Sequence, residues 1–294
     1  MHSTLPTNDP QLPEEKGILY IVATPIGNMD DITLRAIHIL GEVALIAAED
    51  TRRSGQLLAH HGIRGRLISY EEHNEHRRTP ELISRLKEGA SVALVSDAGT
   101  PSVSDPGYRL VRAAIENDIE VVPIPGASAV MTALSASGLP TDAFVFIGFP
   151  ERKKARRLSQ LKQLSEEPRT LVFYESPRRI TRLIAEIVQV MGDRYGVLSR
   201  EMTKLHEEFL RDDLSGILRA VEDRPSVKGE CTLLVSGWTD DQEASMAAAC
   251  QDLEKALVQE GQRLSDVVRR VAQRYGLPRK EVYQEALEIR DRNT

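Results

Sequence analysis

The chain has 294 residues, of which 41% are hydrophobic and 28% charged, and its formal net charge is −6. These proportions are ordinary for a globular protein, and the length allows two or three compact units. The net negative charge argues against a wholly basic surface that encloses nucleic acid, but it permits local basic faces. Cys231 and Cys250 are the only cysteines, which excludes a disulfide framework and a four-thiolate zinc site within one chain. No apolar run could span a bilayer and the first sixteen residues hold no signal-peptide core, so we expect a cytoplasmic protein.

Short apolar runs alternate with helical patterns through the first half of the chain. Strands are expected over Ile18–Ala23, Val43–Ala47, Arg66–Ser69, Val92–Val95 and Ile119–Val122. Helices are expected between them, over Thr33–Leu40, Thr51–His60, Pro80–Lys87 and Pro106–Glu116. Capping oxygens of Thr79, Asp105 and Ser176 each precede a proline, which predicts three helix starts. This alternation predicts an α/β domain with a largely parallel sheet.

A second series of elements begins near residue 140. Strands are expected over Phe144–Ile147, Thr170–Tyr174, Val197–Ser199, Glu207–Leu210 and Cys231–Val235, and helices over Lys154–Leu164 and Pro177–Val190. Because the long helices come early and the strands late, we expect a second α/β unit with some antiparallel pairing. Residues 242–294 show three helical patterns, and the last two, Leu264–Tyr275 and Arg279–Ile289, have the spacing of a helix-turn-helix. A small packing or dimerisation bundle and a nucleic-acid contact both fit this segment.

These patterns divide the chain into four parts. We expect a disordered tail over residues 1–16, an N-terminal α/β domain over 17–136, a second α/β domain over 137–239 and a C-terminal helical domain over 240–294. The boundary between the two α/β domains is placed within Ala136–Asp142, because Gly138 and Pro140 interrupt the pattern there.

Three glycine-containing loops follow strands of the first domain. They begin at Thr24, Ser96 and Pro123, and the second reads SDAGTPSVSDPG. Ligands of open α/β sheets bind at the carboxyl ends of the strands, so these loops are predicted to converge on one crevice. Asp97 directly follows a buried strand and needs a partner there, which favours a functional role. No G-x-G-x-x-G follows a strand and no P-loop is present, which disfavours a dinucleotide-binding dehydrogenase and a P-loop NTPase.

A set of motifs resembles the ribosomal RNA small subunit methyltransferase I family, the RNA-modifying branch of the tetrapyrrole methylase fold. The motifs are TPIGN, AEDTR, EHNE, SDAGTPSVSDPG, PIPGAS, GFP, FYESPRR and REMTK, in the family's order over roughly residues 17 to 290. The resemblance implies two α/β domains with a cofactor cleft between them, a small C-terminal helical domain and a homodimer. It also implies transfer of a methyl group from S-adenosylmethionine to the ribose 2'-oxygen of a cytidine in the decoding region of 16S rRNA. The rRNA partner is expected to lie within the small ribosomal subunit.

The same resemblance implies which residues bind the cofactor. They are Pro25, Gly27, Asp97, Ala98, Gly99, Thr100, Ser102, Val103, Ser128, Ala129, Tyr174, Thr203 and Glu230. A carboxylate such as Asp97 suits an ammonium group, glycine-turn amides suit a carboxylate, and an aromatic ring such as Tyr174 can flank adenine. Asp105 is interpreted instead as a helix cap.

A ribose hydroxyl is a poor nucleophile, so a proton acceptor or a cation that stabilises its alkoxide should assist the transfer. Candidates follow the second and third strands: Glu49, Asp50, Arg52, His73, Asn74 and Glu75. The residue types here do not select one base among them. The Glu72 to His76 segment matches no specific zinc template, and no metal is predicted.

The basic run after residue 150 is the candidate RNA contact. Its cations are Arg152, Lys153, Lys154, Arg156 and Arg157. A solvated helix face would explain such a run, but its position at a strand end favours phosphate contacts. Many relatives have GFLP in this loop, whereas this chain has the shorter Gly148-Phe149-Pro150 followed by Glu151, so we expect the path of the loop and its RNA contacts to differ from theirs.

Two other functions fit parts of the sequence. Methylation of a porphyrin or corrin uses the same fold and would need no basic C-terminal helices. A nucleic-acid-binding regulator could use Leu264 to Ile289, with the α/β part as a ligand sensor. A methyl-transfer assay distinguishes the three functions. Label on RNA favours the rRNA methyltransferase, label on a tetrapyrrole favours the small-molecule methylase, and binding without transfer to either favours the regulator.

Overall fold

The computed structural model describes residues 16–239, 241–257, 264–275 and 277–292. The expected N-terminal tail, apart from Lys16, lies outside these residues. The chain divides into two compact units, Met1–Ser128 and Ala129–Thr294.

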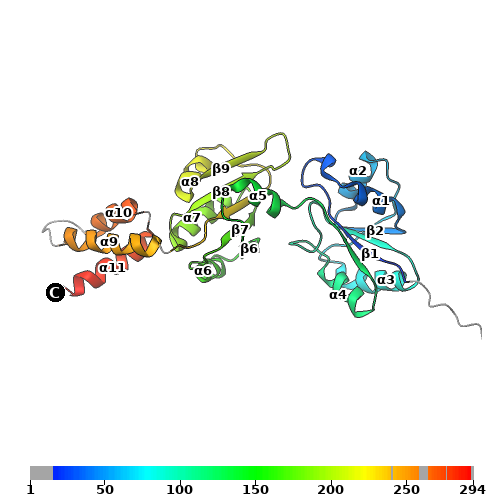
Figure 1. Ribbon diagram of the computed structural model, residues 1–294, viewed down its shortest axis with the longest axis horizontal. Coiled ribbons are helices and arrows are strands. Elements are labelled where there is room, and N and C mark those ends of the chain that lie inside the picture. The colour runs from blue at the N-terminus through cyan, green and yellow to red at the C-terminus, as the bar shows by residue number, and fades with distance from the viewer. Residues whose placement is uncertain (1–15, 240, 258–263, 276, 293–294) are drawn as a thin grey trace, which may run out of the picture. The chain divides into compact units, whose positions relative to one another are not determined.

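The first unit is a five-stranded parallel sheet covered by helices on both faces (Figure 1). Its strands are β1 (Leu19–Val22), β2 (Leu45–Ala48), β3 (Leu67–Ser69), β4 (Val92–Val95) and β5 (Val121–Ile124), in the order β3-β2-β4-β1-β5. Helices α1 (Leu34–Glu42) and α2 (Thr51–His60) lie on one face, and α3 (Glu75–Lys87) and α4 (Tyr108–Glu116) lie on the other. A single 3-10 turn, η1 (Met29–Asp31), follows β1. The predicted parallel α/β architecture is confirmed.

Apolar side chains on the two faces of this sheet explain its two helical layers. Leu19 and Leu45 pack towards α3 and α4, whereas Val22 and Ile46 pack towards α1 and α2. Strands buried on both faces are nearly continuous apolar runs, as β2 and β4 are here.

The three predicted proline helix starts were wrong. Pro80 lies inside α3, which begins five residues earlier at Glu75, and Thr79 donates its hydroxyl to the Glu75 carbonyl over 2.7 Å instead of capping. Pro106 and Pro177 lie in turns before their helices, whose caps are Gly107 and Arg179. Asp105 is therefore not an N-cap. A polar residue before proline is typical of a turn as well as of a helix start, so this pattern alone does not locate the first helical residue.

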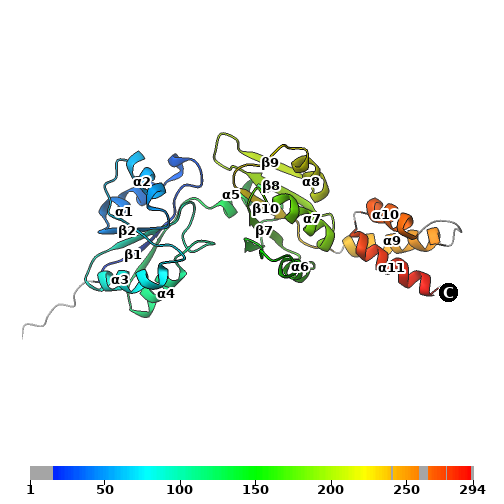
Figure 2. The same ribbon diagram turned by 180° about the vertical axis from the view of Figure 1, so that it is seen from behind.

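The second unit contains a mixed five-stranded sheet (Figure 2). Its strands are β6 (Phe144–Gly148), β7 (Thr170–Glu175), β8 (Tyr195–Arg200), β9 (Glu208–Asp213) and β10 (Cys231–Val235), in the order β6-β7-β10-β8-β9. Only β6 and β7 pair in parallel, and the other pairs are antiparallel. Helices α6 (Lys154–Gln163), α7 (Ile180–Met191) and α8 (Leu214–Glu222) pack on the core that includes Leu171, Phe173 and Leu233. The expected antiparallel pairing is confirmed.

Helix α5 (Ala129–Ser137) belongs to the second unit. It contacts β10, and the Arg211 guanidinium donates to the Ala136 carbonyl over 2.6 Å. The division of the chain therefore falls before α5, whereas the sequence placed the boundary after it, at the small residues that follow.

Three helices complete the second unit: α9 (Asp241–Leu257), α10 (Leu264–Tyr275) and α11 (Arg279–Arg292). Each contacts the other two around a small core that includes Val267, Val271, Val282 and Ile289. The buried positions of α10 and α11 recur at helical spacing, so the two predicted helices pack through the faces that the sequence pattern indicates.

A buried ion pair joins α6 to α7. The Arg157 guanidinium, in a residue only 2% exposed, donates to both carboxylate oxygens of Glu186 over 2.5 and 2.8 Å. It also donates to the carbonyls of Glu151 and Arg152, each over 2.9 Å. The prediction that Arg157 binds RNA was wrong, because the residue is buried and its guanidinium donates to Glu186 and to two main-chain carbonyls within the protein. The basic run alone could not show which cation faces the core.

Breaking this pair should destabilise the second unit strongly. Arg157→Met leaves the Glu186 carboxylate buried without its partner, so the free energy of unfolding should fall by about 3 to 5 kcal/mol. The exposed neighbour offers a matched control, and Arg156→Met should change it by less than about 0.5 kcal/mol. Urea denaturation followed by circular dichroism measures both. Equal effects of the two substitutions would contradict the structural role, whereas adding Glu186→Leu to Arg157→Met should recover part of the loss.

Candidate active site

The carboxyl ends of the five parallel strands of the first unit meet at one edge of the sheet. Polar segments follow the strands at this edge: residues 24–28, 49–50, 70–74, 96–107 and 125–128. An edge of this kind is where open α/β sheets bind ligands.

The loops after β1, β4 and β5 are joined by hydrogen bonds. Thr24 and Gly99 exchange backbone hydrogen bonds of 2.8 and 3.0 Å, and the buried Thr24 hydroxyl donates to the Ser96 carbonyl over 3.1 Å. The Thr100 hydroxyl donates to the Ala127 carbonyl over 3.4 Å. The structure therefore brings together the three loops that carry Pro25 and Gly27, Asp97 to Val103, and Ser128.

Two acidic side chains cross-link the ends of β2 and β4. The Asp97 backbone N–H donates to the Glu49 carboxylate over 3.2 Å, and the Asp50 backbone N–H donates to the Asp97 carboxylate over 3.0 Å. The Arg53 guanidinium lies 3.4 Å from the second oxygen of Asp97. The Asp50 N–H and the Arg53 guanidinium thus supply part of the compensation that the Asp97 carboxylate needs. Its side chain is still 25% exposed, so the carboxylate is also open to a ligand.

Asp105 is a third carboxyl group at the same edge. Burial, together with the nearby charges of Glu49 and Asp97, raises the pKa of Asp105 to about 7. Burial also raises the pKa of Glu49, although the Asp97 N–H opposes this shift. Sequence analysis assigned Asp105 to a helix cap and missed this environment. The available signal was the recurrence of aspartate twice within one loop after a buried strand.

The β4 loop adopts a tight and unusual backbone conformation. Ser102 and Ser104 have φ angles of 70° and 66°, which non-glycine residues rarely adopt. Gly107 has φ of +142°, and a Cβ there would lie 2.4 Å from the Ser102 hydroxyl oxygen. That hydroxyl oxygen is buried and has no hydrogen-bond partner among the described residues. A buried hydroxyl without a partner, in the same loop as the partly exposed Asp97 carboxylate, is consistent with a site for a polar ligand.

Several of the predicted catalytic residues have structural partners. Asp50 caps α2 through the Arg52 backbone N–H, and the Arg52 guanidinium 2.7 Å away holds the pKa of Asp50 well below its usual range. Asn74 accepts from the Glu71 N–H over 3.0 Å and donates to the Ser69 hydroxyl over 2.9 Å. These contacts shape the loops after β2 and β3.

The remaining candidates differ in environment. Glu75 pairs with Arg109 over 3.2 Å, and His73 is exposed. Glu49 combines partial burial with two neighbouring carboxyl groups. Among the six predicted catalytic residues, Glu49 therefore has the environment best suited to holding or accepting a proton.

Three of the four cofactor residues predicted in the second unit lie at or beside one edge of its own sheet, whereas the fourth, Ala129, begins α5. Tyr174 pairs with Thr232, and Cys231 lies opposite Glu175 and Arg200, so the ends of β7 and β8 adjoin the start of β10. Glu230 precedes β10 and lies 3.3 Å from the Lys204 ammonium, and the Thr203 N–H donates to Glu207 over 2.7 Å. The register thus gathers Tyr174, Thr203 and Glu230.

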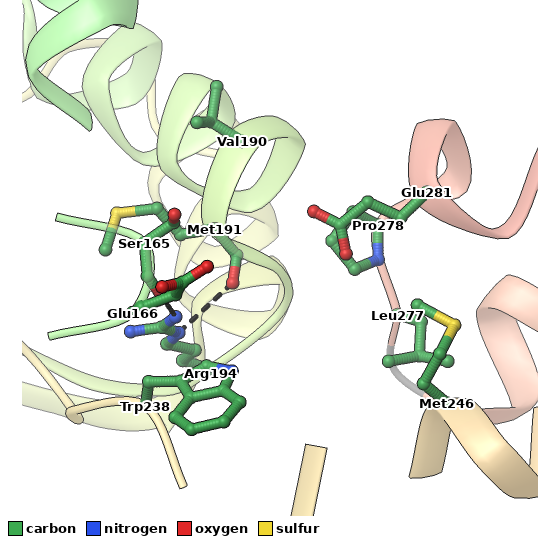
Figure 3. A pocket seen from close by; sticks show the side chains of 10 residues that line it. All are labelled: Ser165, Glu166, Val190, Met191, Arg194, Trp238, Met246, Leu277, Pro278 and Glu281. Carbon is green, nitrogen blue, oxygen red and sulfur yellow. Dashed lines mark hydrogen bonds between the residues drawn. The ribbon is translucent and has the colours of Figure 1, made fainter. Parts of the chain in front are cut away.

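A separate pocket of the second unit surrounds Arg194 (Figure 3). The guanidinium donates to the carbonyls of Met191, over 3.1 Å, and of Ser165, and burial lowers the pKa of Arg194 to about 10. Because its donors already bind main-chain carbonyls, Arg194 serves to close the end of α7 and is not a free anion-binding group.

The described ranges hold neither a metal-binding cluster nor a membrane-spanning helix. No cluster of three or more His, Cys, Asp or Glu side chains there could hold a metal ion. No helix within those ranges has the length and apolar character needed to cross a membrane.

The two sheets and their loops define a methylase fold. A family model described as Tetrapyrrole (Corrin/Porphyrin) Methylases matches residues 18–218, and a model of the RsmI C-terminal HTH domain matches residues 244–290. The crystal structure of uroporphyrin-III C-methyltransferase from Thermus thermophilus complexed with S-adenyl homocysteine is similar to the chain. It has a TM-score of 0.54 and 17% identity, over 75% of this chain and 97% of that one. At this identity the likeness establishes the fold.

Sequence relatives narrow the family. Ribosomal RNA small subunit methyltransferase I of Micromonospora olivasterospora is 46% identical, over 92% of this chain and 86% of the relative. The protein of the same name from Synechocystis sp. is 45% identical, over 93% of this chain and 98% of the relative. The chain belongs to the ribosomal RNA small subunit methyltransferase I family.

The environment of Asp105 predicts a pH-dependent contribution to stability. Because its pKa is raised from 3.8 to about 7, the folded state holds a proton that the unfolded state releases. The resulting stabilisation is full below about pH 4 and is lost as the pH rises through about 7. Asp105→Asn removes this term, so its Tm relative to the wild type should increase between pH 5 and pH 8. Thermal melts of both proteins measure the difference, with exposed Asp223→Asn as the control. Parallel curves for wild type and Asp105→Asn would contradict the assignment.

Proposed function

We propose that the protein transfers a methyl group from S-adenosylmethionine to the ribose 2'-oxygen of a cytidine in the decoding region of 16S rRNA. The observation that carries the proposal is the joined edge of the first sheet, where Asp97, Glu49 and Asp105 lie among loops linked by hydrogen bonds. The relatives named ribosomal RNA small subunit methyltransferase I support an rRNA substrate. The proposed setting is the cytoplasm, with a homodimer acting on the small ribosomal subunit.

The residues at the edge suit the cofactor. Its sulfonium and ammonium groups are cationic, and the partly exposed Asp97 carboxylate can bind the ammonium. The orphan Ser102 hydroxyl and the β4 loop backbone offer hydrogen bonds to polar groups. S-adenosylmethionine supplies the activated methyl group, and the S-adenyl homocysteine bound by the Thermus thermophilus enzyme supports this cofactor.

The remaining predicted cofactor residues are retained in the proposal. In the first unit they are Pro25, Gly27, Ala98, Gly99, Thr100, Val103 and Ser128, which lie in the three linked loops. Ala129, Tyr174, Thr203 and Glu230 come from the second unit. Tyr174 would supply an aromatic surface for adenine.

Glu49 and Asp105 are the proposed proton acceptors. Methyl transfer requires the 2'-hydroxyl to lose its proton to a neighbouring base as the oxygen bonds to the methyl carbon, while the bond from that carbon to the cofactor sulfur breaks and leaves a neutral thioether. A general base is most effective when its pKa lies near the operating pH, and burial moves both carboxyl groups in that direction. Only the ionised form accepts the proton, so one carboxylate of the pair takes it and later releases it to water.

Exposed cations in the second unit are the proposed RNA contacts. Arg152, Lys153, Lys154 and Arg156 are all exposed, whereas Arg157 is excluded by its buried ion pair. Contacts of this kind with phosphates release counterions, so binding should weaken as the salt concentration rises.

A methyl-transfer assay tests the proposed activity directly. Purified protein is mixed with labelled S-adenosylmethionine and 30S subunits that lack the modification, and the label is mapped by nuclease digestion and mass spectrometry. Label at a cytidine 2'-oxygen is expected. Label on a base, or on an added uroporphyrin with none on RNA, would refute the proposed acceptor and favour methylation of a small molecule. Tight RNA binding without turnover would favour a regulator.

Asp97→Ala tests the cofactor site. Loss of a charge-assisted contact to the ammonium should weaken S-adenosylmethionine binding by at least about tenfold, measured by isothermal titration calorimetry. The control is Asp223→Ala, which removes an exposed carboxylate at the end of α8 and should leave the Kd unchanged. Thermal melts establish that both variants are folded. Wild-type affinity in a folded Asp97→Ala protein would remove Asp97 from the site.

A further inference from the structure

An exposed aromatic side chain marks the end of β6. Phe149 is 56% exposed, although Gly148 and Pro150 on either side of it are buried. Its ring centroid lies 5.7 Å from that of Tyr174 with an interplanar angle of 59°, and Tyr174 lies 5.0 Å from Phe146. Three aromatic rings from β6 and β7 therefore form a small cluster, of which Phe149 is the outermost member.

A β-bulge directs Phe149 to this position. The β6-β7 register pairs Phe146 with Val172 but Gly148 with Phe173, so one extra residue is inserted in β6. Gly148 adopts φ of 69°, which glycine does without steric cost. In a regular strand Phe149 would share the face of Val145 and Ile147, which packs on the buried core. The bulge reverses this alternation and places Phe149 beside Tyr174, because bulges re-aim side chains.

Four exposed cations follow Phe149 within seven residues. Arg152, Lys153, Lys154 and Arg156 form no ion pair within the described ranges of the chain. Lys153 is the N-cap of α6, and no acidic residue lies in the first turn. Cations at a helix N-terminus are unfavourable with respect to the helix dipole, so these side chains do not stabilise α6. Their charges are therefore available to an anion from outside the protein.

The buried Arg157 fixes the segment between the aromatic ring and the cations. Its guanidinium holds the carbonyls of Glu151 and Arg152, and the Gln160 side chain accepts from the Glu151 N–H over 3.2 Å. The segment is therefore pre-organised, which lowers the entropy lost on binding.

We propose that Phe149 stacks on an unpaired base of single-stranded RNA while Arg152, Lys153 and Lys154 bind the phosphates beside it. Proteins read single-stranded RNA by combining aromatic stacking with basic side chains, which is the combination found here. An apolar protein surface would contact only the Phe149 ring, and an acidic protein surface would contact only the cations. The inference rests on the proposed function, because it assigns a contact with the RNA substrate of that reaction.

Substitutions at Phe149 separate stacking from apolar packing. Phe149→Leu keeps an apolar side chain but removes the aromatic face, so the KM for 30S subunits should rise by roughly 5- to 150-fold. Phe149→Trp should restore a KM near that of the wild type. The Kd for S-adenosylmethionine, measured by calorimetry, should stay unchanged in both variants. Tyr195, 44% exposed at the start of β8, provides the control, and Tyr195→Leu should leave KM unchanged.

A direct binding measurement requires no catalysis. Trp238→Phe combined with Phe149→Trp places the only tryptophan at the proposed surface, and a single-stranded cytidine oligonucleotide should quench its fluorescence. Adding Lys153→Ala and Lys154→Ala should weaken that binding and reduce its salt dependence.

The outcomes are distinguishable from failure of the proposed function. Wild-type transfer of methyl to RNA with an unchanged KM for Phe149→Leu overturns this inference alone. Weaker binding of S-adenosylmethionine by Phe149→Leu would assign the ring to the cofactor site and overturn this inference. A lower molecular mass of Phe149→Leu in light scattering would assign the ring to a contact between two copies of the chain and would overturn it as well. Absence of any transfer to RNA by the wild type refutes the proposed function itself.

Discussion

The reciprocal hydrogen bonds between the ends of β2 and β4 are the constraint on which the candidate site depends. Each strand contributes one carboxylate and one backbone N–H to this link, through Glu49, Asp50 and Asp97. Parallel strands pair by their backbone along their length, but their loops diverge where pairing ends. The link holds the two loops together beyond the sheet. It also concentrates negative charge, and this charge adds to the effect of burial, which is the main cause of the raised pKa of Asp105 at the same edge.

That concentration of charge has a physical cost which the loop geometry helps to offset. Three carboxyl groups in a partly buried site repel one another unless a proton or a cation compensates. Arg53 supplies one cation at 3.4 Å from Asp97, and a proton on Asp105 removes a second charge near neutral pH. A bound cationic ligand would supply further compensation. The site is therefore expected to couple ligand binding, proton uptake and stability.

The sequence was sufficient for the alternation of elements, because buried parallel strands such as Val92–Val95 are continuous apolar runs with few competing interpretations. It failed at helix starts, because Thr79 lies inside α3 and donates its hydroxyl to the Glu75 carbonyl, whereas Gly107 and Arg179 cap the helices that follow Pro106 and Pro177. The motifs identified the loops of the site through a family resemblance. They could not reveal that Asp105 faces Glu49 or that Arg157 points inward, because both facts depend on residues distant in sequence, including Glu186.

The burial of Arg157 shows why the number of cations in a basic run overestimates the number of phosphate contacts. Five cations occur within six positions, yet the helical period turns one of them into the core, where it orders the segment that carries the others. If the proposed function is correct, the two units bind ligands of opposite charge. The first unit offers carboxylates suited to a small cationic cofactor, and the second offers exposed cations suited to a polyanion. A chain with a net charge of −6 can thus bind RNA, because short-range contacts with local cations outweigh a net charge that salt screens beyond about 8 Å.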